Sequence, residues 1–435
     1  MTTILIWVCL ALAIVAPDAQ ATTYYANAST GNNSNSCAQA QNPATAKADP
    51  MAAVPCLASG DTLHLTGTFT GSTARIYETA VTVPNGTAGN PTIIEGEGAE
   101  GCALAHTCST ILRPTSAATN FESASYITIR KIEFDGTNHA SDDSCVRFGG
   151  SGEGVGGNII LQDVEVHHCS DQAVFFKPGY SNVLLDRVNL HHAGQAGNLE
   201  GHGCYCSGDN TTIQYSSLHD NGLPGSAINS YGAQFFTDEG SPLHQSNNAV
   251  VHHTEIYANR GGGIAIDGDD ALIYNNLIYG QLEGDGIDTG YSGSLRALIY
   301  NNVIYNNPSY GIRVGAFGSG NNSSLINNHV VGNSTNVVIE SGTTGVTQTT
   351  NRTTGSITDC TVSTSDFSHK SGSLCVDAGT TVGAVTTDYI GTSRPQNGAF
   401  DIGAYEYIVS AGGEGGGQLQ EPAWSSPRRS PFRIR

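Results

Sequence analysis

A short phrase returns at a fixed interval in the second half of the chain. Residues 273–279 read IYNNLIY, residues 299–305 read IYNNVIY, and residues 325–331 read LINNHVV. The step is 26 residues each time, from Asn275 to Asn301 to Asn327. A fixed step with short β-branched runs between turn residues is typical of stacked coils, in which each repeat packs on its neighbours. The sequence therefore predicts a solenoid rather than a globular sandwich.

The repeat can be followed upstream in less regular copies. They occupy residues 129–134, 161–166, 185–190, 213–218 and 251–256. Each copy is followed by a variable loop and a second short strand that Gly often opens, at residues 203–206, 263–266, 286–289 and 311–314. Three short strands per coil predict an all-β, single-stranded parallel β-helix with Val, Ile and Leu facing inward. The turn asparagines tolerate left-handed backbone angles, and we expect their amides to bond to the Asn of the next coil.

Three parts of the chain resemble the right-handed parallel β-helix superfamily, the pectate-lyase-like proteins. The first is the opening segment, Thr23–Ala26 with Gly60–Leu63, and the second is the repeat region from about 121 to 345. The third is the run from Val376 to Tyr407, which ends in DIGAYEY and resembles the closing segment of many secreted bacterial members. The resemblance implies a right-handed helix. It leaves the activity open, because this fold carries lyases, hydrolases, epimerases and phage tail spikes.

The domain organisation follows from changes in composition. Residues 1–21 read as a secretory signal peptide, with an apolar run at 4–15 before small residues. Residues 22–410 form the predicted β-helix domain, including a closing segment at about 360–407. Residues 411–435 read as a Gly-rich linker and a disordered basic tail. We expect a protein that is secreted or periplasmic and has no transmembrane segment.

The cysteine count fits an oxidising compartment. Of 11 cysteines, Cys9 leaves with the signal, so ten remain. An even number in a secreted chain predicts disulfides, and the absence of CxxC pairs disfavours a metal site. Several cysteines are near neighbours, although their connectivity does not follow from sequence: Cys37 and Cys56, Cys102 and Cys108, Cys145 and Cys169, Cys204 and Cys206, and Cys360 and Cys375.

The charge balance restricts the partners. The chain has 38 acidic residues against 18 Lys and Arg, a formal net charge of −20. Nucleic acid is therefore not an expected partner, because phosphate contacts need clustered cations. A polyanionic sugar is compatible only if cations bridge it. We expect a polysaccharide substrate or surface glycan as the partner, and a monomer.

The superfamily resemblance implies a substrate cleft along the sheet of Gly-opened strands. Lys177 follows the apolar strand 173–176, where partial burial would lower its pKa and suit it to remove a proton alpha to a carboxylate. Arg147 lies one coil earlier in a similar column and would hold the substrate carboxylate bidentately. The alternative for Lys177 is a solvated lysine at a strand end.

A second constellation is acidic. Asp267 and Asp288 belong to neighbouring coils, and Asp285 opens the second of these strands. Adjacent carboxylates repel unless a cation or a shared proton relieves them. Ca²⁺ is the expected metal, since it prefers oxygen ligands; alternatively, a raised acid and an ionised base would suit glycoside hydrolysis. For Asp269 and Asp270 we expect turn chemistry.

Further candidates line the same predicted sheet and its loops. Glu200 and His202 form a Glu-Gly-His-Gly motif whose GHG resembles the histidine motif of polygalacturonases, although the other motifs of that family are absent or out of order. Tyr205 and Arg313 are candidate substrate-binding residues. The insertion at 230–246 carries two aromatic residues that would either stack on sugars or pack on the helix, Phe235 and Phe236.

A column of histidines is expected on another strand. His167, His191 and His219 share one position on consecutive coils, with His168, His192 and Asp220 beside them. Stacked imidazoles bind transition metals. The same column continues as Tyr257, Tyr279 and Tyr305, so we favour ring stacking as a structural device.

These features lead to one main hypothesis and two alternatives. The main one is a secreted lyase that cleaves a uronate-containing glycan by β-elimination, with Lys177 as base, Arg147 as carboxylate neutraliser, and Asp267 and Asp288 as Ca²⁺ or sugar ligands. The first alternative is an inverting glycosidase with an acid–base pair drawn from the Asp cluster and Glu200. The second is a non-catalytic surface or adhesion protein whose coils only supply a rigid rod.

Overall fold

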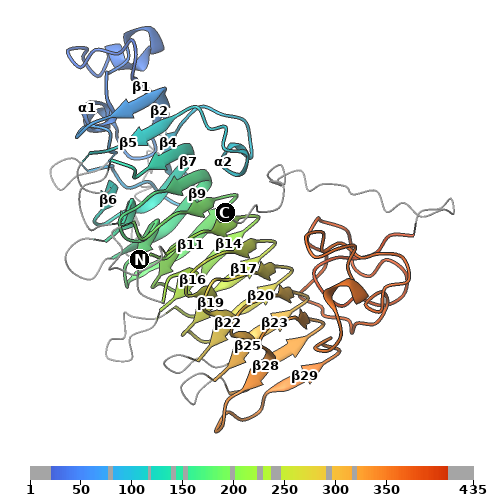
Figure 1. The fold of residues 1–435 in the computed structure, drawn as a ribbon. Helices are drawn as coiled ribbons and strands as arrows, with labels where there is room; N and C mark the ends of the chain where they lie inside the picture. Colours follow the sequence, from blue (N-terminus) through green and yellow to red (C-terminus); the bar gives the residue numbers. More distant parts are fainter. Residues whose placement is uncertain are drawn as a thin grey trace, which may run out of the picture.

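The computed structural model describes residues 21–76, 82–115, 119–138, 144–149, 155–195, 201–222, 229–236, 246–290, 296–315 and 321–409. Figure 1 shows short parallel strands piled in register into an elongated coil. The predicted parallel β-helix is thus confirmed. Glu200 and residues 237–245 of the predicted binding loop, as well as the signal peptide up to residue 20 and the tail from residue 410, lie outside the described residues.

One nine-stranded sheet, here called the front wall, contains the Gly-opened strands. Its members are β6 (Thr119–Phe121), β8 (Val146–Phe148), β10 (Val174–Phe176), β13 (Cys204–Cys206), β16 (Tyr231–Phe235), β19 (Gly262–Ile266), β22 (Asp285–Thr289), β25 (Tyr310–Val314) and β28 (Thr335–Ile339).

The remaining strands form one twenty-stranded sheet that bends at a corner. They are β1 (Thr23–Asn27), β2 (Thr62–Thr66), β3 (Thr68–Thr70), β4 (Thr92–Glu95), β5 (Ile111–Arg113), β7 (Ser125–Asp135), β9 (Gly156–His167), β11 (Tyr180–Asp186), β12 (Asn189–His191), β14 (Thr211–Gln214), β15 (Ser217–His219), β17 (Val250–His252), β18 (Glu255–Tyr257), β20 (Leu272–Tyr274), β21 (Leu277–Tyr279), β23 (Leu298–Tyr300), β24 (Val303–Tyr305), β26 (Ser324–Ile326), β27 (His329–Val331) and β29 (Thr347–Thr349).

The corner explains why β7 and β9 are long. Each runs through the bend, where Lys131 and Asp163 take left-handed backbone angles of φ 58° and 54°. In later coils the same bend separates two strands, as at Asn275 and Asn301, both with φ 52°. We call the strands after the bend the side wall, from the second halves of β7 and β9 through β12, β15, β18, β21 and β24 to β27.

Helix is a minor component. The described helices are α1 (Pro50–Ala53), α2 (Cys102–Ala105) and the 3₁₀ turns η1 (Gln39–Gln41), η2 (Pro43–Thr45), η3 (Val54–Cys56) and η4 (Ile357–Asp359). No helix among the described residues combines the length and the apolar character that crossing a membrane requires.

The interior is a continuous stack of aliphatic and aromatic side chains. Val, Ile and Leu from the three strands of each coil are fully buried, for example Ile273, Ile278 and Ile287 within one coil. The rings of Phe121, Phe148 and Phe176 stack on one another in the upper coils, with centroids 4.8 and 4.6 Å apart. Burial of these side chains is the main driving force for the fold.

The two asparagines of each Asn-Asn pair have different structural roles. The first of each pair occupies the left-handed bend, and the second forms a buried ladder through its side-chain amide. Asn276 Nδ2 donates to Asn302 Oδ1 at 3.0 Å, and Asn302 Nδ2 donates to Asn328 Oδ1 at 3.0 Å. The expected Asn–Asn bonds between coils are therefore confirmed. Because these amides are fully buried, each one that lost its partner would leave an unsatisfied polar group.

Replacing Asn302 with alanine is expected to lower the free energy of unfolding by about 3 kcal/mol. The change removes a donor to Ile273 O and leaves both the backbone and the side-chain N–H of Asn276 without their acceptor. Chemical denaturation measures the effect. Asn397→Ala, at an exposed amide, serves as the control and should cost about 0.5 kcal/mol or less; equal losses in the two variants would contradict the ladder's role.

The closing segment lies beside the last coils rather than across their end (Figure 1). It binds the bend through the first asparagine of each pair. Asn275 Nδ2 donates to Thr387 O at 2.6 Å, Asn301 Nδ2 to Asp401 O at 3.0 Å, and Asn327 Nδ2 to Thr380 O at 2.7 Å. One continuous segment thus connects successive coils along the corner.

Five disulfides join the ten cysteines of the described residues. They are Cys37–Cys56, Cys102–Cys108, Cys145–Cys169, Cys204–Cys206 and Cys360–Cys375. Cys145–Cys169 bridges adjacent coils, as expected. This pattern fits an oxidising compartment.

Candidate functional site

Side chains on the front wall form vertical columns because the strands are parallel and in register. Within each strand, alternate residues point inward and outward. The outward column contains Asn120, Arg147, Phe175, Tyr205, Gln234, Ala265, Asp288, Arg313 and Val338. Arg147, Tyr205, Asp288 and Arg313, predicted from sequence as site residues, therefore share one line.

A second column follows at the ends of these strands. Backbone hydrogen bonds align Gly149, Lys177, Ser207, Phe236, Asp267, Gly290, Gly315 and Glu340 on successive coils. Lys177 and Asp267 thus occupy the same edge of the same wall, three coils apart. With a rise of about 4.8 Å per coil, roughly 14 Å separates their backbones. The predicted residues lie on one face but form two groups along it.

The first group is a cation–aromatic patch made of Arg147, Phe175, Lys177, Tyr205 and Phe236. The Arg147 guanidinium lies 5.6 Å from the centre of the Phe175 ring. Phe175 meets Tyr205 edge-on at 5.1 Å, and Tyr205 stacks with Phe236 at 5.8 Å. All five side chains are half-buried. The patch offers two cations beside a row of rings, a combination suited to a flat, negatively charged sugar.

His202 lies beneath this patch rather than on it. The residue is fully buried, with its ring 5.1 Å from that of Tyr205. Its Nδ1 accepts the backbone N–H of Tyr231 at 3.0 Å, so the ring proton resides on Nε2. This arrangement fixes the imidazole and makes His202 a support for Tyr205.

The second group is an acidic patch made of Asp267, Asp285, Asp288, Arg313 and Glu340. Asp288 pairs in register with Ala265, the residue two before Asp267, and its side chain is 5% exposed. Burial, together with the nearby Asp285 and Asp267, raises the pKa of Asp288 to about 7, against the opposing effect of Arg313. Asp288 therefore changes protonation near neutral pH.

The remaining contacts of the acidic patch involve the carboxylates of Asp285, Glu340 and Asp288. Asp285 Oδ1 accepts the backbone N–H of Tyr310 at 2.9 Å, and Arg313 Nε donates to Glu340 Oε1 at 2.9 Å. Asp288 Oδ1 is buried and has no hydrogen-bond partner. Asp285 and Asp267 lie near enough to Asp288 to raise its pKa, so these three carboxylates are candidate oxygen ligands for a hard cation such as Ca²⁺.

Phe235 is a correction to the sequence-based prediction. It is fully buried, facing inward between Cys206 and Ile266 of the neighbouring coils. The sequence analysis places residues 231–235 within an insertion, whereas in the structure they form β16, a regular strand of the front wall. Strand alternation then directs Phe235 to the core and leaves Phe236 at the half-exposed strand end.

Turn chemistry accounts for the neighbouring Asp269 and Asp270, as expected. Asp270 has φ 58°, and Arg296 from the next coil contacts both carboxylates, at 3.2 Å for Asp269 and 2.6 Å for Asp270. Phe175 is the main residue of the wall that the sequence reasoning missed. Its place was readable from the alternation in Ala173–Lys177, where Val174 and Phe176 point inward.

Comparisons with known proteins agree with this architecture. Residues 234–362 match a family model described as "Right handed beta helix region". The chain thus has a right-handed parallel β-helix fold. No curated protein sequence matches it.

Among solved structures, this chain is similar to pectate lyase Pel9A, with a TM-score of 0.56, 15% identity, and coverage of 88% of this chain and 96% of that one. An alginate lyase from Paenibacillus sp. str. FPU-7 gives a TM-score of 0.47 at 17% identity, covering 69% of this chain and 95% of that one. The periplasmic alginate epimerase AlgG gives 0.42 at 13%, covering 68% and 71%. At 15% identity, the likeness to pectate lyase Pel9A shows the fold and not the activity.

Proposed function

We propose that this protein is a secreted polysaccharide lyase that cleaves a uronate-containing glycan on its front wall. The observation that carries the proposal is the cation–aromatic patch, where Arg147, Phe175 and Tyr205 follow one another on consecutive coils with Lys177 beside them. Rings bind the faces of sugars, the Arg147 cation suits the uronate carboxylate, and the Lys177 amine suits the proton next to it.

The proposed reaction assigns each cation a role. Arg147 pairs with the uronate carboxylate and stabilises the negative charge that develops on it. Lys177 Nζ, in its uncharged amine form, removes the proton alpha to that carboxylate. The electron pair released forms a carbon–carbon double bond, the glycosidic bond to the adjacent carbon breaks, and the departing oxygen takes up a proton. The product carries an unsaturated uronate at its new end.

The acidic patch gives the proposal a metal dependence. The net charge of −20 repels a polyanion unless cations intervene. Ca²⁺ held by Asp267, Asp285 and Asp288 would supply such a bridge to a uronate several units from the cleaved bond, since these residues lie three to four coils from Lys177. We propose that Ca²⁺ acts there in substrate binding and that proton abstraction belongs to Lys177.

A second function is favoured by one specific observation, the elevated pKa of Asp288. A carboxylic acid with a pKa of about 7 beside other carboxylates resembles the acid and base pair of a glycosidase. In this alternative, the acidic patch hydrolyses a neutral glycan and the cation–aromatic patch only binds it.

One assay separates these functions. Purified full-length protein is incubated with a panel of uronate and neutral glycans, with Ca²⁺ or with EDTA. The lyase proposal expects ultraviolet absorbance from an unsaturated uronate that EDTA abolishes. New reducing ends without that absorbance would indicate hydrolysis. Glycan binding with neither product would indicate a non-catalytic adhesion protein, and either of these two results would overturn the lyase proposal.

Tyr205→Leu is expected to raise KM about tenfold and to leave kcat within a factor of two or three, because it removes a stacking surface worth roughly 1.4 kcal/mol. Steady-state kinetics on the glycan that the panel identifies provide the measurement. Tyr257→Leu removes a half-buried stacked ring from the side wall and should leave KM unchanged. An unchanged KM in Tyr205→Leu would remove Tyr205 from the binding surface.

A further inference from the structure

The side wall carries a ladder of histidines that is separate from the proposed catalytic face. His167, His191 and His219 stack at centroid distances of 5.0 and 4.9 Å, and Tyr257 continues the stack at 4.7 Å. This confirms the column expected from sequence. Each histidine also contacts a polar side chain of the preceding coil through Nε2; for His191 this partner is Glu165, at 2.9 Å.

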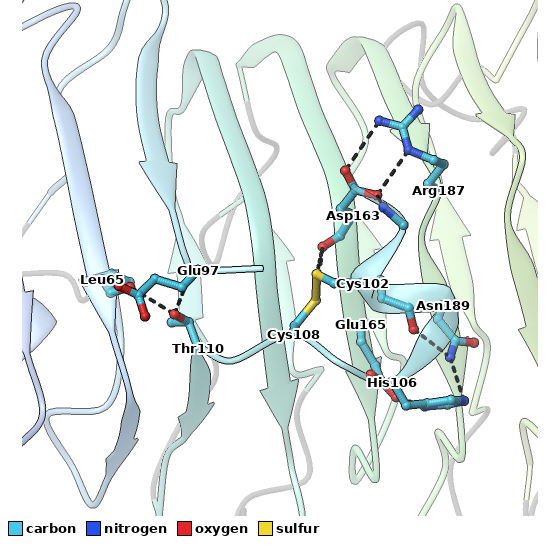
Figure 2. The surroundings of a disulfide bond; sticks show 12 residues. Leu65, Glu97, Cys102, His106, Cys108, Thr110, Asp163, Glu165, Arg187 and Asn189 are labelled. Carbon is cyan, nitrogen blue, oxygen red and sulfur yellow. Dashed lines mark hydrogen bonds and ion pairs between the residues drawn. A yellow bond between two sulfur atoms is a disulfide. The ribbon is translucent and has the colours of Figure 1, made fainter. Parts of the chain in front are cut away.

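A disulfide-closed loop brings one more histidine to this ladder. Helix α2 lies across β9, and the Cys102–Cys108 bond closes the loop around it (Figure 2). The backbone N–H of Gly101 donates to Asp163 Oδ1 at 2.7 Å, which fixes the loop to the bend. His106 ends the helix with φ 54° and lies against Glu165.

Three ligand atoms therefore converge at Glu165. His106 Nδ1 is 2.5 Å from Glu165 Oε1, and His191 Nε2 is 2.9 Å from the same oxygen. All three atoms lie within 4.8 Å of one another. Glu165 is 3% exposed, and its second oxygen, Oε2, is buried without a hydrogen-bond partner. His106 and His191 both contact Glu165 Oε1, whereas Glu165 Oε2 has no hydrogen-bond donor.

We propose that His106, Glu165 and His191 form a binding site for a divalent transition-metal ion of the Zn²⁺ class. Two imidazole nitrogens and a carboxylate are a ligand set that Zn²⁺ accepts, with a fourth position left for water. A bound ion would pair with the buried Glu165 carboxylate, whose second oxygen, Oε2, has no hydrogen-bond partner. His106 is 35% exposed, so an ion can reach the site from solvent.

Neighbouring side chains suit the tautomers that metal binding requires. His191 Nδ1 faces His192 Nδ1 at 2.7 Å, so the proton displaced from Nε2 can be held between these two rings. The Asn189 amide faces His106 Nε2 at 3.4 Å. A half-turn of that amide would present its oxygen to the Nε2 proton, the outer contact that metal-bound histidines usually make, at the cost of the hydrogen bond from Asn189 Nδ2 to Ala103 O and with an exchange of the atom that faces His219 Nε2.

Two other groupings among the described residues offer weaker cases. Asp135, beside His167 and His168, already accepts hydrogen bonds from Arg113 and Thr137 on its two oxygens. His329 lies near Cys360 and Cys375, whose sulfurs are joined in a disulfide and do not bind a metal in that state. The site at Glu165 does not require a disulfide to be reduced before it can bind an ion.

The test is titration of the EDTA-treated, desalted full-length protein with ZnCl₂ by calorimetry. It is paired with Co²⁺ absorption spectroscopy, which reports coordination directly. One equivalent of Zn²⁺ is expected to bind in the micromolar range or tighter, and the Co²⁺ spectrum should show low-symmetry, nitrogen-containing coordination. Glu165→Gln keeps the shape of the side chain and is expected to abolish both signals.

Two further variants make the test decisive. His106→Ala changes an exposed loop residue, so it should fold normally and still lose the ion. His64→Ala removes a histidine that pairs with Glu95 at 3.2 Å elsewhere on the coil, and it should bind Zn²⁺ as the unmodified protein does. Zn²⁺ binding that survives in His106→Ala and Glu165→Gln, or that is absent from the unmodified protein, would overturn the proposal.

Discussion

Replacing Lys177 with alanine is expected to lower kcat on the uronate glycan by about 10²–10⁴-fold, the range that a positioned general base contributes. The loss should fall on kcat rather than KM, because Arg147 and the aromatic rings that bind the sugar remain in place. Initial rates of unsaturated-product formation, followed across a range of substrate concentrations, measure both constants.

The control must remove a lysine without touching the front wall. Lys131 lies in the bend with φ 58°, a conformation that asparagine tolerates, so Lys131→Asn should fold and retain full activity. Arg147→Lys separates the two cations: it keeps the charge but loses the bidentate contact, and it should weaken carboxylate recognition. Full activity in Lys177→Ala would show that another group abstracts the proton.

The second large effect concerns Asp288 and stability. Its pKa is about 7 in the folded protein, well above the usual value for aspartate, because its ionised form is buried beside Asp285 and Asp267. Between about pH 4 and pH 7 the folded state therefore holds a proton that the unfolded state has released, so stability falls as pH rises through this window. Asp288→Asn removes the penalty and should stabilise the metal-free protein at pH 8 by roughly 4 kcal/mol, with little change at pH 4.

Calcium adds a second arm to the same experiment. An ion bound at the acidic patch favours the ionised carboxylate, so Ca²⁺ should raise the Tm of the unmodified protein at pH 8 and leave that of Asp288→Asn unchanged. Asp270→Asn alters an exposed turn carboxylate paired with Arg296 and should keep the calcium response. A Tm that rises equally in all three proteins would place the ion elsewhere, and destabilisation of Asp288→Asn at pH 8 would contradict the buried charge.

The architecture could be predicted from sequence because the repeat acts on the backbone directly. Asn275, Asn301 and Asn327 occupy left-handed bends that asparagine tolerates better than most residues, and the apolar positions around them have the two-residue period of strands. Once the copies are aligned, the neighbours across coils follow. This explains why Arg147, Lys177, Tyr205 and Asp288 could be assigned to one wall before any coordinates.

The failures have an equally physical origin. The inward orientation of Phe235 could not be predicted because Gly232–Gln234 contains none of the branched residues that mark a strand. Without a recognisable strand, the sequence does not show which residues alternate inward and outward. His106 went unnoticed because it lies 59 residues from Glu165 and reaches it only through the fold of a disulfide-closed loop. Contacts made by loops outside the repeat have no period that a sequence can reveal.

The lateral position of the closing segment has a consequence for how the rod comes apart. A solenoid held only by contacts between adjacent coils can unfold from its free end one coil at a time. Here the closing segment accepts hydrogen bonds from Asn275, Asn301 and Asn327, so the last coils cannot unfold independently of one another. Unfolding from that end therefore requires the closing segment to dissociate first. We expect the last coils, at the end nearer the acidic patch, to unfold together in one cooperative step rather than one after another.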